Sequence, residues 1–153
     1  MYFSLTNDFD VTGMKSVSHK GIEVCYFGFP IKLGCNLGDE SITSIIEEYM
    51  AGGVDFSSIY GHFYLSIYDQ HKDERLFFTD NSGICKLYFT NCCLSSSFLQ
   101  ILENNKLSTL NPEGVIEFLR FGSVFFNQTV VDGVQTLSRN KVLKIKSSRF
   151  AFE

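Results

Sequence analysis

The chain of 153 residues carries 13 basic and 17 acidic side chains, a formal net charge of −4, and 44% of its residues are hydrophobic. This length and apolar content suit one domain with a buried core, and a second domain is not expected. A nucleic-acid surface normally needs a concentrated basic face, so the acidic balance and the scattered lysines and arginines argue against that class.

Apolar runs and cysteine spacing bear on compartment and cofactors. No apolar run approaches the roughly 20 residues that a membrane-spanning helix requires, and the first ten residues lack the basic and long apolar regions of a secretory signal. The five cysteines form no C-x-x-C pair, and no histidine pair complements them. We expect a cytoplasmic protein with reduced cysteines, no bound metal and no cofactor. A bond between Cys92 and Cys93 is expected to be strained, because neighbouring residues of a strand face opposite ways.

The first third of the chain predicts two strands. Residues 2–6 suit a short strand, residues 7–13 a turn, and residues 21–29 (G-I-E-V-C-Y-F-G-F) a longer strand. Pro30 weakens or ends the second strand, because proline has no N–H to donate to a β-ladder.

A helix is expected after a glycine-containing loop. Its apolar residues repeat at helical spacing: Ile42, Ile45, Ile46, Tyr49 and Met50. Asp39 or Ser41 would cap the start of this helix, and the glycine pair at positions 52–53 would stop it.

The stretch 59–89 is rich in aromatic and branched residues and predicts a three-stranded meander. Side chains alternate faces along residues 63–68, as they do in an extended chain. A charged loop would end this strand, residues 76–79 would form the second, and residues 84–89 the third. This meander is expected to seed a buried sheet.

A second helix is expected after a short extended segment at residues 91–95. Ser96 or Ser97 would cap its first turn, since a serine oxygen can accept a hydrogen bond from a free backbone N–H. The apolar face would hold Phe98, Ile101 and Leu102.

A third helix is predicted from its terminal residues. Asn111 suits the cap, Pro112 suits the first helical position, and Gly122 lies just past the end. Its buried stripe is expected to hold Val115, Phe118 and Leu119.

The C-terminal residues suggest a strand, a turn at Ser147-Ser148 and a final strand. Lys144 and Lys146 would share the exposed face of a solvated edge strand, which resists pairing with other chains. Strands in runs, with helices grouped between them, favour an α+β fold whose sheets are covered by helices.

No spacing of catalytic side chains identifies a known site. His62 follows the glycine that begins a strand, and edge packing explains it better than catalysis. Asp80 and Asn81 begin a tight turn, where Asx hydrogen bonding explains both residues. The acidic loop around Asp69 lacks the glycine and final glutamate of a calcium-binding loop.

Several motifs in order resemble the N-terminal glutaminase domain of asparagine synthetase, a class II glutamine amidotransferase. The family's "dGxFafaiyD" is similar to G-H-F-Y-L-S-I-Y-D at 61–69, and "RDRxGxkPLyY" to T-D-N-S-G-I-C-K-L-Y-F at 79–89. Its "faSEikaLl" resembles L-S-S-S-F-L-Q-I-L at 94–102. Its "ldPeaLaeyLafGyv" and "xTlfxgVxkL" look like residues 110–124 and 129–137. The resemblance covers most of the chain.

The resemblance implies the four-layer α-β-β-α sandwich of N-terminal-nucleophile hydrolases, here reduced in the N-terminal third. The whole chain would be one degenerate glutaminase domain. The ATP-pyrophosphatase half of the family, with its Ser-Gly-Gly-x-Asp-Ser loop, is absent from residues 1–153. The family's activity is glutamine-hydrolysing asparagine synthesis.

The same resemblance implies that the catalytic residues are lost. The family's nucleophile is an N-terminal cysteine, whereas Met1 is followed here by Tyr2. The family's "NGE", which supplies oxyanion donors, falls at Phe27-Gly28-Phe29. The family's substrate-binding aspartate corresponds to Asp39, although aligning the helix by its isoleucine pair places Ser41 there instead. These residues would form a relic glutamine pocket without catalytic residues.

We therefore expect a non-catalytic domain that scaffolds or docks an ATP-dependent amide-forming synthetase domain or subunit, or that associates with itself. The candidate docking residues are Phe121, Phe125 and Phe126, because the family's corresponding segment runs near the boundary with the synthetase half. Two alternatives stay open. One is a glutaminase with a rearranged nucleophile. The other is a sensor that keeps the old pocket, now lined by Phe27 and Phe29, for a small apolar ligand.

Overall fold

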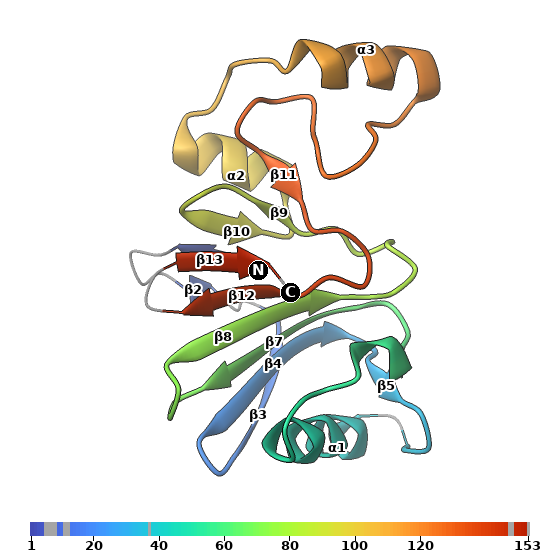
Figure 1. Cartoon of the computed structure of the whole chain (residues 1–153), viewed down its shortest axis with the longest axis vertical. Coiled ribbons are helices and arrows are strands. Elements are labelled where there is room, and N and C mark those ends of the chain that lie inside the picture. Colours follow the sequence, from blue (N-terminus) through green and yellow to red (C-terminus); the bar gives the residue numbers. More distant parts are fainter. Residues whose placement is uncertain (5–8, 11–12, 37, 147–148, 153) are drawn as a thin grey trace. The chain divides into compact units, whose positions relative to one another are not determined.

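A computed structural model describes residues 1–4, 9–10, 13–36, 38–146 and 149–152 (Figure 1). The described residues are 24% helix and 34% strand, in several antiparallel sheets. They divide into two compact units. Unit 1 comprises Met1–Asp10 and Lys86–Ser138, and unit 2 comprises Val11–Cys85 and Arg139–Glu153. Each unit is therefore assembled from two segments that are distant in the sequence.

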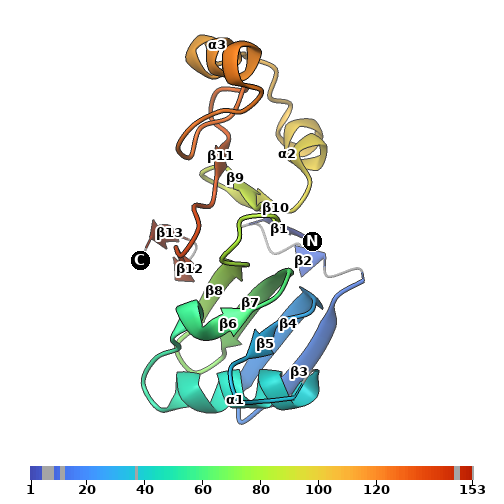
Figure 2. The same cartoon turned by 90° about the vertical axis from the view of Figure 1, so that its right-hand side faces the viewer.

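Unit 2 contains a six-stranded antiparallel sheet in the order β13-β12-β8-β7-β4-β3 (Figure 2). Its strands are β3 (Lys15–His19), β4 (Ile22–Gly28), β7 (Phe63–Asp69), β8 (Glu74–Thr79), β12 (Leu143–Lys146) and β13 (Arg149–Phe152). A separate pair joins β5 (Ile31–Lys32) to β6 (Ile59–Tyr60), and a short 3-10 helix (Phe56–Ser58) precedes β6. Helix α1 (Asp39–Met50) packs on β3 and β4.

The core of unit 2 lies between this sheet and α1. Phe63, Leu65 and Ile67 alternate along β7, as expected, and join the apolar stripe of α1 in one buried cluster. In that stripe, Ile42, Ile45, Ile46 and Tyr49 are buried, as the helical spacing predicted. Burying a large aliphatic or aromatic side chain contributes about 1.5–3 kcal/mol, so this cluster provides much of the stability of unit 2.

The predicted meander is wrong in its third strand. Strands β7 and β8 pair as expected, with Leu65 opposite Phe78. The other neighbour of β8 is β12, and only Tyr88–Phe89 forms a strand (β9), which belongs to unit 1. The cause is the turn at Asp80. Its carboxylate binds the backbone amides of residues 84 and 85, which keeps them from donating to a β-ladder.

The prediction of a solvated edge strand at Lys144 and Lys146 is also wrong. Strand β12 is an interior strand, paired with β8 on one side and β13 on the other. The Lys144 ammonium lies 3.0 Å from a carboxylate oxygen of Glu74, so its charge is paired. The two C-terminal strands are confirmed, while the expected turn at residues 147–148 lies outside the described residues.

Helix α1 ends before the glycine pair as predicted, but neither expected residue caps its start. Gly38 occupies the cap position with φ of 88°, a conformation that glycine adopts readily. The buried Ser41 hydroxyl instead donates to the carbonyl of Asn36 and accepts from the amide of Lys32. Ser41 therefore fastens the preceding loop to the helix.

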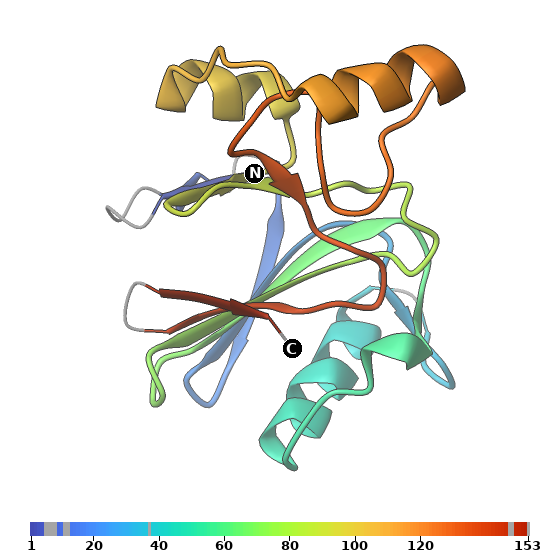
Figure 3. The ribbon, with the colours of Figure 1, turned by 45° about the horizontal axis from the view of Figure 1, so that its top comes forward.

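Unit 1 contains a five-stranded sheet in the order β11-β9-β10-β1-β2 (Figure 3). Its strands are β1 (Tyr2–Ser4), β2 (Phe9–Asp10), β9 (Tyr88–Phe89), β10 (Cys93–Ser95) and β11 (Gln135–Thr136). Strand β2 lies within the turn that was predicted for residues 7–13. Residues 7–8 and 11–12 of that segment lie outside the described residues. Helix α2 (Phe98–Asn105) packs on β9 and β10, and the Ser97 side chain caps it as predicted.

Helix α3 (Pro112–Phe121) has the predicted ends but not the predicted burial. Pro112 is in the first turn, and Gly122 adopts the left-handed conformation at the C-terminal cap. Two residues of the expected buried stripe are exposed, since Phe118 is 52% and Leu119 is 77% accessible, and Val115 is only half-buried. Gly114 is the buried residue of this helix. None of the described helices is both long and apolar enough to cross a membrane.

Candidate functional site

The buried carboxylate of Asp80 organises the turn that follows strand β8. One oxygen accepts from the Cys85 amide at 2.7 Å, and the other accepts from the Ile84 amide at 3.1 Å and from the Ser82 hydroxyl. Burial alone would raise the pKa of Asp80, but these hydrogen bonds outweigh it and hold the pKa below its ordinary value. The carboxylate is thus a structural anion, committed to its own loop.

The imidazole of His62 lies near this carboxylate but is largely open to solvent. Its Nδ1 atom is 3.8 Å from an oxygen of Asp80, beyond ordinary hydrogen-bond length, and 60% of the side chain is exposed. The backbone carbonyl of His62 accepts from the amide of Phe29 at 3.0 Å. The backbone of His62 therefore ties the end of β4 to the start of β7.

Two glycines allow this close approach of the backbone. Gly28 has a φ of 89°, and a Cβ atom placed there would lie 2.1 Å from the carbonyl oxygen of His62. Gly61 has a φ of 104°, and its Cβ would lie 2.0 Å from the carbonyl oxygen of Phe29. Both distances are far below van der Waals contact, so glycine is required at both positions for steric reasons.

The predicted pocket residues lie on two faces of β4. Phe27 and Phe29 are 54% and 73% exposed, and the Phe27 ring lies 6.3 Å from the ring of Tyr64. Asp39 begins α1, and its carboxylate accepts from the Tyr26 hydroxyl at 3.4 Å. Because neighbouring residues of a strand face opposite ways, Tyr26 and Phe27 project to opposite faces. The structure therefore places Asp39 on the helix side of β4, away from Phe27.

Two thiols of unit 2 are poor nucleophiles. Burial, followed by the nearby Glu23 carboxylate, raises the pKa of Cys25 to about 11. Burial, followed by Asp80, raises the pKa of Cys85 to about 11 as well. A thiol reacts as its thiolate, so both cysteines are almost entirely in the unreactive form at neutral pH.

A group of exposed apolar side chains covers helix α3 and the loop after it, here called the α3 face. Phe121 and Phe125 contact each other with ring centroids 5.2 Å apart, and Phe126 is 91% exposed. The face comprises Ile116, Phe118, Leu119, Phe121, Phe125 and Phe126. Large exposed apolar patches are uncommon on monomeric proteins and mark interaction sites. Of the predicted docking residues, Phe121 and Phe125 therefore contact each other, and Phe126 follows as an exposed neighbour in the chain.

Helix α3 is fixed from its N-terminal end. A Cβ atom at Gly114 would lie 2.4 Å from the carbonyl oxygen of Thr129, so the helix backbone rests directly on that segment. The Asn111 amide donates to the same carbonyl at 3.1 Å instead of capping the helix. On the other side, the Glu117 carboxylate accepts from the Phe125 amide at 2.8 Å. The α3 face is therefore presented on an anchored helix.

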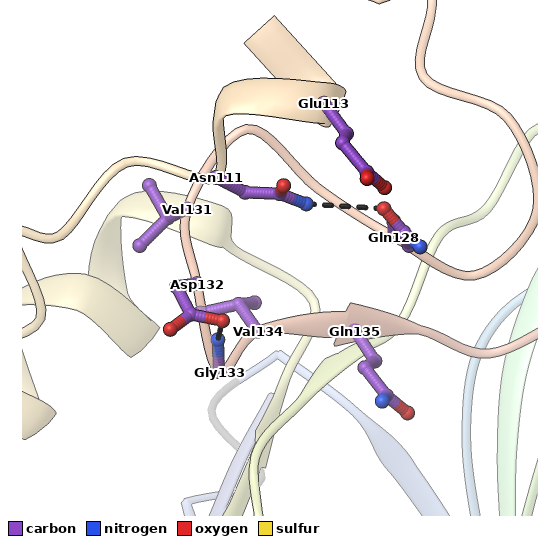
Figure 4. Close-up of a pocket in the computed structure, with 8 residues that line it drawn as sticks. All are labelled: Asn111, Glu113, Gln128, Val131, Asp132, Gly133, Val134 and Gln135. Atoms are coloured by element: carbon purple, nitrogen blue, oxygen red, sulfur yellow. Dashed lines mark hydrogen bonds between the residues drawn. The ribbon is translucent and has the colours of Figure 1, made fainter.

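A polar hollow of about 320 Å³ lies in unit 1 beside the start of α3 (Figure 4). It is lined by Asn111, Glu113, Gln128, Val131, Asp132, Gly133, Val134 and Gln135. The Asn111 amide donates to Gln128 at 3.1 Å across the hollow, and Asp132 accepts from the Gly133 amide at 3.0 Å. The sequence did not predict this hollow, because its lining residues come from the start of α3 and from residues 128–135, which the local pattern does not connect.

No protein-family model matches the chain, and no curated protein matches it. Within the described ranges, no three side chains of His, Cys, Asp or Glu gather closely enough to hold a metal ion. The geometry thus defines a buried structural aspartate, an exposed aromatic pair at the end of β4, and an exposed apolar helix face.

Proposed function

We propose that this chain is a non-catalytic, glutaminase-like domain of the asparagine synthetase type, which docks an ATP-dependent amide-forming synthetase domain or subunit. The observation that carries the proposal is the α3 face. It exposes Phe121, Phe125 and Phe126, in the segment whose counterpart in the resembling family runs near the boundary with the synthetase half. A helix with an uncovered apolar stripe gains stability when a partner removes that stripe from water.

The finer architecture belongs to the same proposal. Each unit contains one large antiparallel sheet with a helix packed on it, α1 in unit 2 and α2 in unit 1. Two such halves are the components of a four-layer α-β-β-α sandwich of the N-terminal-nucleophile hydrolase type. The Asp80 turn supports this assignment, because it occupies the position of the family's "RDRxG" motif and its carboxylate determines the shape of the loop.

Loss of glutaminase activity is supported by the residues at the end of β4. The aromatic rings of Phe27 and Phe29 flank Gly28, where the resembling family has polar groups that stabilise the transition state. We therefore expect the purified protein to release no ammonia from glutamine above the rate in buffer. Release clearly above that rate from homogeneous protein would establish the alternative, a glutaminase with a rearranged nucleophile.

Docking is tested with a synthetase-type partner chain that is co-expressed and purified with this protein. Replacing Leu119 by glutamate places a charge in the α3 face and should weaken the complex roughly 30-fold, the effect of losing about 2 kcal/mol at an interface hot spot. The matched control is Leu99→Glu, since Leu99 is a 68% exposed leucine on α2 of the same unit. Equal affinity for the two variants in titration calorimetry would contradict docking through α3.

A second candidate function, a sensor of small apolar ligands, is favoured by one observation. Phe27 lies in β4 and Phe29 directly follows that strand, yet both rings are exposed. The Phe27 ring also lies beside Tyr64. A ligand that binds the folded state and not the unfolded state raises the melting temperature, by an amount that grows with the logarithm of its concentration above Kd. Thermal stabilisation by an aromatic ligand that disappears in Phe29→Ser, but not in Leu99→Ser, would support this alternative.

A further inference from the structure

Cys92 and Cys93 form a pair of thiols whose arrangement differs from the sequence-based expectation. Strand β10 begins at Cys93, so Cys92 lies in the turn before it rather than in the strand. The amide of Thr90 donates to the carbonyl of Cys93 at 2.8 Å, which closes this turn around residues 91 and 92. The rule that neighbouring strand residues face opposite ways therefore does not apply to this pair.

Both sulfur atoms contact the same two side chains. The Thr90 hydroxyl lies 3.4 Å from the Sγ atom of Cys92 and 3.1 Å from that of Cys93. The Asn105 carboxamide also bridges the pair, since its oxygen accepts from Cys92 at 3.3 Å and its nitrogen donates to Cys93 at 2.9 Å. Two thiols that share a hydroxyl and a carboxamide lie on the same side of the turn.

The surrounding groups hold this arrangement in place. The Thr90 hydroxyl accepts from the backbone amides of Cys92 and Cys93 at 3.3 and 3.2 Å, so its position is fixed by the turn. The Asn105 amide also donates to the carbonyl of Ile101 at 2.7 Å, which fastens it to helix α2. Cys92 is exposed and Cys93 is buried, so a reagent from solvent reaches Cys92 first.

We propose that Cys92 and Cys93 form a two-sulfur binding site for trivalent arsenicals, a class of compound that takes two neighbouring thiols at once. The pair provides two sulfur ligands on adjacent residues, with one side open to solvent. Burial, with a further contribution from Cys92, raises the pKa of Cys93, so a ligand must displace a thiol proton rather than bind a ready thiolate. An arsenoxide meets that requirement, because its own oxygen accepts the protons.

The bonding step is balanced without an oxidant or reductant. An aryl arsenoxide has one arsenic–oxygen bond that the two thiols replace. Two sulfur–arsenic bonds form, the arsenic–oxygen bond breaks, and both thiol protons leave with the oxygen as one water molecule. Arsenic stays trivalent. The product is a closed ring, and opening one sulfur–arsenic bond leaves the other in place, so the adduct is more stable than one with a single thiol.

Phenylarsine oxide is the probe for this site. The full chain is reduced, freed of reductant and mixed with one equivalent of the probe, and its intact mass is measured before and after challenge with excess 2-mercaptoethanol. We expect one adduct per chain that survives the monothiol and is removed by 2,3-dimercaptopropanol. Peptide mapping of the wild-type adduct should place arsenic on the segment with Cys92 and Cys93. A different location, or loss to the monothiol, would overturn the proposal.

Two cysteine variants test the requirement for both sulfurs. Cys92→Ser removes the exposed thiol and leaves the buried one, so apparent affinity should fall roughly 100-fold or more because the second bond is no longer formed within the same molecule. Cys35→Ser is the matched control, since Cys35 is a thiol of unit 2 without a neighbouring cysteine in the sequence. Equal retention of the probe by both variants would also overturn the proposal.

Discussion

Helices α1 and α3 have apolar stripes of the same kind, yet the two stripes lie in opposite environments. Ile42, Ile45 and Ile46 of α1 are completely buried in the core of unit 2, whereas Leu119 of α3 is 77% exposed. The difference teaches that helical spacing of apolar residues predicts that a helix has an apolar face, and does not predict what covers that face. Of these two helices, α1 packs on strands β3 and β4 of the six-stranded sheet, and this sheet covers its apolar stripe.

The polar contacts of the two helices differ as well. The end of α1 is fastened through Tyr49, whose hydroxyl donates to the buried carboxylate of Asp69 at 3.0 Å. Lys72 completes this network, with its ammonium 3.1 Å from the same carboxylate. Helix α3 instead rests on a loop through the close approach of Gly114. The stability of the fold should therefore depend on α1 much more than on the side chains of the α3 face.

The largest expected effect on stability is a difference between substitutions in the stripe of α1 and in the stripe of α3. Ile45→Ala removes a fully buried side chain and should lower the free energy of unfolding by about 2–5 kcal/mol, while Leu119→Ala should change it by less than about 0.5 kcal/mol. Urea denaturation followed by circular dichroism measures both. Similar losses in the two variants would break the distinction between a covered and an uncovered stripe.

The next effect tests the polar anchor of α1. Tyr49→Phe removes the hydrogen bond to Asp69 and should lower the free energy of unfolding by roughly 1.5–3 kcal/mol at pH 7, the usual range for a bond to a charged group. Exposed Tyr60→Phe is the control, since it removes a hydroxyl from the surface.

At acidic pH, Tyr49→Phe should lower the free energy of unfolding by less than it does at pH 7. Burial raises the pKa of Asp69, but hydrogen bonds from Lys72, Tyr49 and the backbone outweigh it, so the pKa in the folded state is lowered. Because the pKa of Asp69 is lower in the folded state than in the unfolded state, where it is about 4, the ionised carboxylate stabilises the fold at pH values above about 4. This contribution disappears as the pH falls through the folded-state pKa. The difference between wild type and Tyr49→Phe should shrink below pH 4, and an unchanged difference would contradict the charged-acceptor assignment.

A third variant tests how α3 is held. In Gly114→Ala the new methyl group would meet the carbonyl oxygen of Thr129 at 2.4 Å, so the helix must move away at a cost of about 1–3 kcal/mol. Amide hydrogen exchange along α3 should then be roughly tenfold faster or more. Arg120→Ala is the matched control at an exposed position of the same helix. Unchanged exchange in Gly114→Ala would mean that this contact does not anchor α3.

The smallest expected effect concerns the α3 face itself. Leu119→Glu should leave the free energy of unfolding within about 0.5 kcal/mol of the wild-type value, because the side chain already meets water. The same variant should remove any self-association that the apolar face supports, as measured by sedimentation at several concentrations. A large loss of stability would show that Leu119 belongs to the folded core rather than to a docking surface.

Local pattern predicted much of the secondary structure, and the errors have physical causes. The apolar face of α1, the serine cap of α2 and the C-terminal pair of strands are confirmed. Strand β3 was missed, because its sequence, K-S-V-S-H, is polar and it lies at the edge of the sheet. The candidate pocket residues were inferred from a resemblance, which does not show on which face of β4 each one lies. The chain passes from β4 into α1, and this path places Asp39 beside Tyr26 rather than beside Phe27.

The sequence by itself determined the three helices and the long strands β4, β7 and β8, because periodicity, caps and glycine conformations act over a few neighbouring residues. Only the tertiary structure decided that β9 leaves the sheet of β8, that the stripe of α3 is uncovered, and that Cys92 and Cys93 share Thr90 and Asn105. The cover of α3 and the contacts of Asn105 depend on packing between segments that no short stretch of sequence brings together.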